Sequence, residues 1–316
     1  MEQAIAEPNT GPPTVSVVVP AYNPGSRLAA TIESVRAQTF GDWEIVVVDD
    51  CSPEDVRAAL GSFADDPRLR LIRHDTNGGP SAARNTGVAH ARGRFVAFLD
   101  ADDSWHPEKL TRQVAAVMAR PDPDRVFCVT RTIVNLADDR HIVRPVRGKR
   151  PDEAMDEFIF VSGNFCQTSA FFLSRALARR IGWRDLVTGE DHLFAIDAIA
   201  AGAEYLLVEE SLTTYNNDVR PGRLSHTTTL ERGRRFMEQV RGVLSQKALA
   251  GYESRYLGVM LLRQHPVQGL QTLVRAVATG ALPPRFAATL LVRTAVPAGL
   301  YHRVRSRLMG RPAKRA

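Results

Sequence analysis

The chain has 316 residues, more than a single domain usually holds, which predicts one large domain plus an appendage. Its hydrophobic fraction of 44% and charged fraction of 24% are ordinary for a soluble globular protein. The formal net charge of +6 matches the basic residues of the C-terminal tail, and the rest of the chain is balanced, which argues against a general affinity for nucleic acid. These tail residues are Arg303, Arg305, Arg307, Arg311, Lys314 and Arg315.

The terminal segments and the cysteines favour a cytoplasmic protein. The N-terminus has no apolar core, so we expect no signal peptide. The late apolar stretch 286–301 is broken by Arg293 and Pro297 and is too short to span a bilayer, so we expect no transmembrane helix. The three cysteines are scattered without metal or redox spacing, which predicts a reducing compartment.

Strand and helix patterns alternate through the first 120 residues or so. Apolar runs typical of buried strands lie at 15–20, 44–48, 69–72 and 95–99, and helical patterns separate them. This alternation is the signature of an α/β fold with a mostly parallel sheet and helices on both faces.

Polar residues follow three of these strands, most clearly Asp100-Ala101-Asp102-Asp103 after the run 95–99. Open α/β sheets bind ligands beyond the carboxyl ends of their strands, so these acids should lie in a site. Carboxylates hold Mg²⁺ or Mn²⁺ together with substrate phosphates, which suggests a phosphate-bearing substrate. The alternative is an acidic turn in which Asp103 or Ser104 caps a helix with Pro107 in its first turn.

Later segments predict a covering loop and a helical appendage. Residues 137–156 are polar and punctuated by proline, which predicts a loop that could cover a substrate. Glu190-Asp191 open an apolar helical pattern, a strand is expected at 205–208, and the pattern is helical from about residue 227 onward.

Five motifs, in this order and at this spacing, resemble the family 2 glycosyltransferases of GT-A fold. The motifs are Val17-Val18-Val19-Pro20-Ala21-Tyr22-Asn23, Val48-Asp49-Asp50-Cys51-Ser52, Gly79-Pro80-Ser81-Ala82-Ala83-Arg84-Asn85-Thr86-Gly87, Phe98-Leu99-Asp100-Ala101-Asp102-Asp103 and Gly189-Glu190-Asp191. The resemblance predicts a catalytic domain over 14–226, with a Rossmann-like nucleotide-binding sheet, and a helical C-terminal region over 227–316. It implies an inverting, metal-dependent transfer from a nucleotide sugar, with a UDP-sugar favoured, to a hydroxyl acceptor in polysaccharide or glycoconjugate biosynthesis.

The resemblance also implies the residues of the donor site. Nucleotide-sugar binding is expected from Pro20, Ala21, Tyr22, Asn23, Asp50, Arg84, Asp100 and Ala101. Tyr22 offers a face for stacking on a base, and Asp50 can accept a hydrogen bond from an imide N–H of uracil or thymine. Arg84 reaches the base or the diphosphate, or else pairs with Asp50 or Asp100.

Asp102 is the expected contact of Mn²⁺ or Mg²⁺, and His226 is a candidate additional ligand. Asp103 is expected to support the turn or to cap a helix. On the acceptor side the resemblance implies Asp191 as general base, with Glu190 as its orienting neighbour. The simpler interpretation of this pair is favourable charge at a helix N-terminus.

The basic tail has two interpretations. Following Leu290, Leu291, Val292 and Val296, it could hold the protein peripherally on an anionic membrane surface, which would suit a lipid-linked sugar acceptor. It could equally be a solvated end. No motif identifies the acceptor, the donor sugar or the linkage.

Two other functions compete with sugar transfer. A sugar nucleotidyltransferase should have a Gly-rich triphosphate loop straight after the first strand, where this chain has Ala21-Tyr22-Asn23-Pro24. A non-catalytic nucleotide-sugar-binding protein should have lost a carboxylate, whereas Asp102 and Asp191 are both present.

Overall fold

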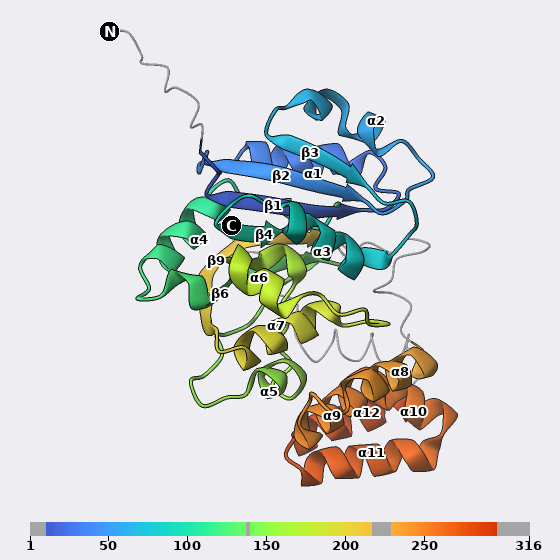
Figure 1. Cartoon of the computed structure of the whole chain (residues 1–316). Coiled ribbons are helices and arrows are strands. Elements are labelled where there is room, and N and C mark those ends of the chain that lie inside the picture. The colour runs from blue at the N-terminus through green and yellow to red at the C-terminus, as the bar shows by residue number, and fades with distance from the viewer. Residues whose placement is uncertain (1–10, 137–139, 217–228, 296–316) are drawn as a thin grey trace, which may run out of the picture. The chain divides into compact units, whose positions relative to one another are not determined.

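The computed structural model describes residues 11–136, 140–216 and 229–295 (Figure 1). Contacts divide the chain into two compact units. The first contains Met1–Met155 and Asn164–Arg223, and the second contains Asp156–Gly163 and Leu224–Ala316. The segment Asp156–Gly163 thus groups with the C-terminal helices, although it lies inside the range 14–226 expected for the catalytic domain. That domain division stays a prediction.

The first unit begins with the expected α/β alternation. Strands β1 (Val15–Ala21), β2 (Trp43–Asp49), β3 (Leu69–Arg73) and β4 (Phe95–Phe98) lie in the order β3-β2-β1-β4 and are all parallel. The helices between and after them are α1 (Arg27–Arg36), α2 (Val56–Leu60), α3 (Gly79–His90) and α4 (Lys109–Met118). The predicted fold class and these strand positions are confirmed (Figure 1).

The same sheet continues with strands of mixed direction. Its order runs on through β8 (Phe171–Ser174), β6 (Val126–Asn135), β9 (Glu204–Asn216) and β5 (Ser104–Trp105). Strand β8 is antiparallel to both β4 and β6, whereas β9 is parallel to β6. The expectation of a loop over 137–156 is wrong in part, because β7 (His141–Arg144) pairs with β6.

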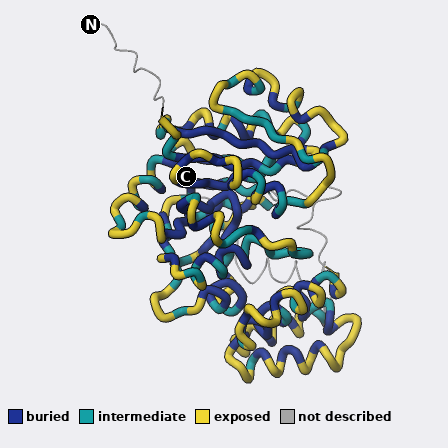
Figure 2. Tube along the Cα trace, in the orientation of Figure 1, coloured by how far each residue is buried: buried dark blue, intermediate teal, exposed yellow. Residues whose placement is uncertain are grey.

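The sheet is the core of this unit, and Figure 2 shows its strands as the most deeply buried part. One face packs valines and isoleucines of β1 and β2 against α1 and α4. On the other side Phe98, Phe171 and Trp183 gather around Phe194 of α7 (Glu190–Ala200). Helix α6 (Arg175–Ile181) follows β8. Helix α3 packs closely on β1 because Gly87 has no side chain there, where a Cβ would lie 2.3 Å from a Val18 methyl carbon.

The second unit is helical, as predicted. Its helices are α8 (Leu230–Val240), α9 (Gln246–Tyr252), α10 (Gly258–Gln264), α11 (Pro266–Ala278) and α12 (Pro284–Ala295), with a π-helical turn at Glu253–Leu257. Its apolar core draws on α9 to α12. Among the described residues, no helix is long and apolar enough to cross a membrane.

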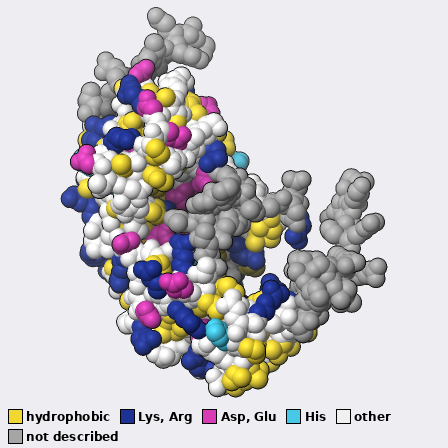
Figure 3. All heavy atoms as spheres, turned by 90° about the vertical axis from the view of Figure 1, so that its right-hand side faces the viewer, with side chains coloured by type: hydrophobic (Ala, Val, Ile, Leu, Met, Phe, Trp, Pro, Cys, Tyr) yellow, Lys and Arg dark blue, Asp and Glu magenta, His cyan; other side chains and the backbone are white. Residues whose placement is uncertain are grey.

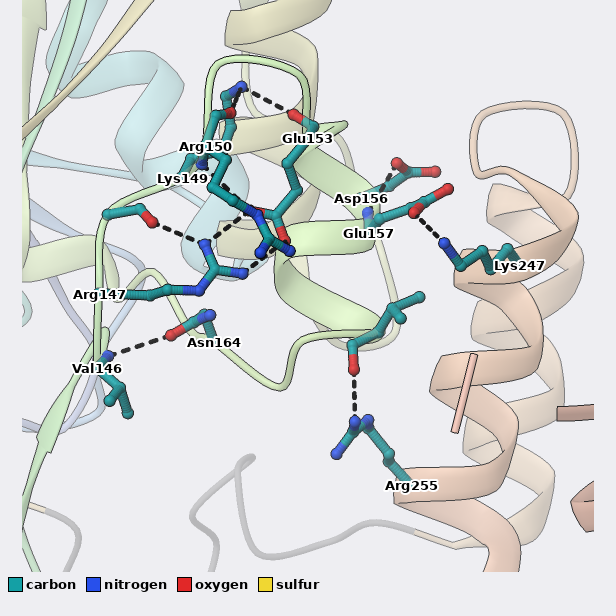
Figure 4. Close-up of polar contacts among 12 residues, drawn as sticks. Val146, Arg147, Lys149, Arg150, Glu153, Asp156, Glu157, Asn164, Lys247 and Arg255 are labelled. Atoms are coloured by element: carbon teal, nitrogen blue, oxygen red, sulfur yellow. Dashed lines mark hydrogen bonds and ion pairs between the residues drawn. The ribbon is translucent and has the colours of Figure 1, made fainter. Parts of the chain in front are cut away.

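Helix α5 (Met155–Phe160) carries the chain from the first unit into the second (Figure 4). Asp156 accepts a 2.8 Å hydrogen bond from the Ser245 amide, and Lys247 pairs with Glu157 at 2.6 Å. Arg255 donates to the carbonyl oxygen of Val161. These contacts explain why Asp156–Gly163 belongs to the helical unit.

Candidate functional site at the carboxyl ends of the strands

Strands β1, β2 and β4 end side by side at one edge of the sheet. In the ladder, Ala21 pairs with Asp49, and Val18 pairs with Phe98. The Asp50 amide donates a 2.8 Å bond to the Ala21 carbonyl. The predicted segments 20–23, 49–50 and 100–103 therefore lie next to one another, at the edge where open α/β sheets bind ligands.

The turn after β1 presents Tyr22 to solvent with 54% of its surface exposed. Asn23 adopts a left-handed conformation with φ of 46°, and its amide donates a 3.0 Å bond to the Ser52 hydroxyl. Cys51, two residues after the end of β2, is also left-handed with φ of 61°. Such conformations are costly for residues other than glycine and cluster at functional sites.

Asp50 is buried and holds the start of α3. Its Oδ1 accepts bonds from the Gly78 amide at 2.9 Å and from His74 Nδ1 at 2.8 Å, and its Oδ2 accepts from the Gly79 amide at 2.7 Å. A carboxylate offers about four acceptor positions, and these contacts occupy three of them.

Arg84 is buried and pairs with carboxylates from two directions. Its Nη2 lies 2.8 Å from Asp100 Oδ1, and its Nη1 lies 3.6 Å from Glu190 Oε1. Of the two partners considered from the sequence, the structure selects Asp100 over Asp50. The guanidinium also stacks on the Trp183 ring, 4.5 Å from its centroid.

The buried side chain of Asp103 anchors the acidic turn after β4 to the rest of the unit. This buried carboxylate accepts a 2.7 Å bond from the Ser169 hydroxyl, a 2.6 Å bond from Gln167 Nε2 and a 3.2 Å bond from the Asn216 amide. Burial, with neighbouring Asp100 and Asp102, raises the pKa of Asp103 well above its usual value.

The alternative in which Asp103 or Ser104 caps a helix is wrong. Helix α4 begins at Lys109, and Ser104 lies in β5. Pro107 therefore precedes the helix and does not lie in its first turn. Asp103 instead accepts hydrogen bonds from Gln167 and Ser169, which the sequence pattern did not connect to it.

Asp102 lies at the partly exposed tip of this turn, and its backbone carbonyl accepts a 2.8 Å bond from Asn216 Nδ2. Residues 11–136, 140–216 and 229–295 contain no group of three or more His, Cys, Asp or Glu side chains placed to hold a metal. Mg²⁺ is often held by one or two carboxylates plus substrate phosphates, and the partly exposed Asp102 fits that role. His226 lies outside the described residues.

Glu190 and Asp191 form the first turn of α7, which follows Gly189 in a left-handed conformation with φ of 71°. Burial raises the pKa of Glu190, and Asp191 adds to this effect, although Arg84 opposes it. The His192 amide bonds Asp191 Oδ1 at 2.7 Å, and the His192 ring lies 3.5 Å from the same oxygen. The two carboxylates therefore have different surroundings.

Several supporting residues were not foreseen. Asn85 makes two 2.8 Å bonds to the backbone of Trp183, which fix the loop before α7. Gln167 and Ser169 hold Asp103 as described above. Asn85 lies inside the motif 79–87 and could have been singled out from the sequence, whereas no local signal marks Gln167, Ser169 or Trp183.

Comparison with protein families and curated proteins gives consistent relatives. The model described as "Glycosyl transferase family 2" matches residues 16–182. The succinoglycan biosynthesis protein ExoO of Rhizobium meliloti (strain 1021) is 33% identical over 227 residues, covering 69% of this chain and 64% of that protein. The chain spans less than two thirds of the length of the first curated relatives that it matches.

Two solved structures share the fold. S. aureus TarS 1-349 in complex with UDP-GlcNAc has a TM-score of 0.58 at 20% identity, over 88% of this chain and 83% of that one. The mannosyltransferase PcManGT of Pyrobaculum calidifontis, in complex with GDP-Man and Mn²⁺, has a TM-score of 0.55 at 22% identity, over 90% and 80%. At these identities the likeness concerns the fold alone.

Proposed function

The chain belongs to glycosyl transferase family 2 and has the GT-A fold, and on that premise we propose that it moves a sugar from a nucleotide sugar to a hydroxyl acceptor. The observation that carries the proposal is the convergence of the polar strand ends with the acid pair of α7. Arg84 contacts both Asp100 of the strand-end turn and Glu190 of that pair.

The donor is proposed to be a UDP-sugar bound along residues 20–23. Exposed Tyr22 offers a stacking face, and the remaining acceptor position of Asp50 suits a uracil imide N–H. The UDP-GlcNAc in TarS supports this choice, whereas the GDP-Man in PcManGT makes a guanine nucleotide the alternative to test. Arg84, Asp100 and Ala101 would lie near the ribose and the diphosphate.

A nucleoside diphosphate leaves with developing negative charge, which must be neutralised. Asp102 is proposed to hold Mn²⁺ or Mg²⁺, and His226 is a candidate second ligand. When bound, such an ion supplies Lewis-acid stabilisation of the departing diphosphate. The Mn²⁺ in PcManGT supports a divalent cation.

Inversion at the sugar carbon requires a base on the face opposite the leaving group. We assign this role to Asp191, which would take the proton of the acceptor hydroxyl. Glu190, with its pKa raised by burial, would orient the acceptor and keep its position through Arg84.

The role of ExoO in succinoglycan biosynthesis supports a place in polysaccharide or glycoconjugate assembly. The acceptor is accordingly proposed to be a glycan or a lipid-linked sugar. The three free cysteines fit a cytoplasmic setting, and the basic C-terminus would allow peripheral contact with the inner face of the membrane.

Thermal shift with nucleotides tests the donor. At a concentration of UDP about 100 times its dissociation constant, with Mn²⁺ present, the melting temperature should rise by roughly 5–10 °C. GDP and ADP at the same concentration are the controls, and a panel of UDP-sugars tested for hydrolysis would identify the sugar. A larger shift with GDP would overturn the uridine assignment, and no hydrolysis or transfer with any nucleotide sugar would overturn the activity.

A further inference from the structure

Helix α11 of the second unit carries an apolar stripe on its outer face. Val267, Leu270 and Val274 are spaced to lie on one side of the helix and are 72%, 50% and 61% exposed. The opposite side of α11 is buried and contributes to the core of the unit. The stripe therefore consists of residues other than those that pack α11 into the core of the unit.

Helix α12 adds exposed apolar residues of its own. Leu291 and Val292 are exposed, whereas Leu290 is only 1% exposed and packs in the core of the second unit. Leu290, one of the apolar residues that precede the basic tail, is therefore part of the protein core and does not face a membrane. Figure 3 shows hydrophobic side chains gathered over the lowest part of the view, with Lys and Arg side chains nearby.

Positive charge predominates around these helices, where Glu253 pairs with Arg275 of α11. After Glu253 the sequence contains no Asp or Glu through residue 316, but it contains eleven Lys and Arg residues. They are Arg255, Arg263, Arg275, Arg285, Arg293, Arg303, Arg305, Arg307, Arg311, Lys314 and Arg315. Arg263, Arg285 and Arg293 are exposed on or beside the helices that carry the apolar side chains.

This positive charge distinguishes between three kinds of partner for the apolar stripe: a second copy of the chain, a nucleic acid and an anionic lipid surface. In a symmetric dimer through this face, the same cationic surfaces would meet and repel one another. A nucleic acid would match the charge but would leave the aliphatic side chains without a partner. Anionic lipid satisfies both features, since its headgroups attract arginine while the apolar side chains enter the interface.

We propose that the outer face of α11, formed by Val267, Leu270 and Val274, docks on an anionic membrane surface, with Arg263, Arg285 and Arg293 as its cationic flank. Each basic side chain at such a surface contributes about fivefold to the partition coefficient. Several of them together with the stripe would therefore give reversible attachment that salt weakens. This inference does not rest on the proposed sugar transfer.

The test is flotation of the full chain with two kinds of vesicle, phosphatidylcholine alone and phosphatidylcholine mixed with phosphatidylglycerol. The chain should float with the mixed vesicles only. A triple variant with Val267→Gln, Leu270→Gln and Val274→Gln should partition at least about tenfold less. Glutamine is a good helix former, so α11 should persist in this variant.

Met118→Gln is the matched control, because Met118 is an exposed apolar residue on α4 of the other unit, and it should float like the wild type. A second variant, Arg263→Gln with Arg285→Gln, keeps the stripe and should partition about 25-fold less, since two charges are lost. The melting temperature of each variant, measured without nucleotide or lipid, checks that the fold is retained.

Three results would overturn the proposal. One is equal flotation of the triple variant and the wild type. The second is equal recovery of the wild type with neutral and anionic vesicles. The third is a concentration-dependent dimer that the triple variant abolishes, which would assign the stripe to a second copy of the chain.

Discussion

Arg84 Nη2 donates a 2.8 Å hydrogen bond to Asp100 Oδ1, and this pair ties helix α3 to the acidic turn after β4. The same guanidinium lies 3.6 Å from Glu190, so one buried cation faces the acids of two distant segments. A buried ion pair contributes little net stability, but the loss of one partner leaves an uncompensated charge. Substitution of Arg84 is therefore expected to disturb both parts of the candidate site, the turn that contains Asp100 and the acid pair that contains Glu190.

Replacement of Arg84 should affect both stability and turnover. Arg84→Lys keeps a charge but not the planar fork, and should lower kcat/KM by roughly 10- to 100-fold, the equivalent of one charge-assisted hydrogen bond. Arg84→Met should lower the free energy of unfolding by about 3 kcal/mol, measured in urea. Arg57→Met removes an exposed ion pair and should cost at most about 1 kcal/mol. Wild-type kcat/KM in Arg84→Lys would contradict the proposed role.

Isosteric substitutions should distinguish the roles of the two acids at the start of α7. Asp191→Asn cannot accept a proton and should lower kcat by about 100-fold or more, with UDP binding nearly unchanged. Glu190→Gln should cost less, because an orienting group does not take the proton. Steady-state kinetics and UDP titration measure both. The assignment is reversed if Glu190→Gln is inactive while Asp191→Asn turns over normally.

Asp102, at the tip of the acidic turn, should be needed for transfer but not for stability. Asp102→Ala should abolish transfer and weaken UDP binding in Mn²⁺ or Mg²⁺, with little change in the melting temperature. Excess chelator should have the same effect on the wild type. Full activity of the wild-type chain in chelator would exclude the proposed metal dependence.

Asp103 should matter for stability through its shape and acceptors. Asp103→Ala removes the acceptor of bonds from the Ser169 hydroxyl, the Gln167 side chain and the Asn216 amide, and should lower the free energy of unfolding by about 1–3 kcal/mol. Asp103→Asn should cost less, because it keeps the side-chain shape and one acceptor oxygen, and because burial, which raises the pKa of Asp103, weakens the preference for the charged form. Urea unfolding at pH 7 compares the two, and an equal loss for both would show that the negative charge itself is needed.

Lys109 should make stability depend on pH. Burial lowers its pKa to about 7, whereas a lysine in an unfolded chain titrates near 10.4. Between these values the unfolded state binds more protons, so the free energy of unfolding should rise with pH, by up to about 1.4 kcal/mol per unit. Below pH 7 the folded state must bury a charged ammonium, and stability should be lowest.

Lys109→Met should remove this rise, measured by urea unfolding between pH 6 and 9 relative to the wild type. Lys247→Met, at a partly exposed position, is the control and should keep the wild-type slope. An unchanged slope in Lys109→Met would mean that Lys109 stays charged in the fold through hydrogen bonding to Gln113 and stacking on Trp105.

The α/β class, the first four strands and the position of the polar strand ends could be predicted from the sequence. Local patterns suffice for these features, because a buried parallel strand requires an apolar run and parallel strands end at a common edge. The strand order, and the register that pairs Val18 with Phe98 and Ala21 with Asp49, were decided by the tertiary structure.

The partners of the charged side chains depended on the tertiary structure. Arg84 had two candidate partners in the sequence, and only the packing of α3 on β1 brings it to Asp100 and Glu190. Asp103 meets Gln167 and Ser169, 64 and 66 residues further along the chain, because β8, which follows them closely, enters the sheet between β4 and β6. A side chain's charge is a local property, but its hydrogen-bond partners and burial are set by long-range packing, and that is why the sequence identified the acids while the fold decided what each one contacts.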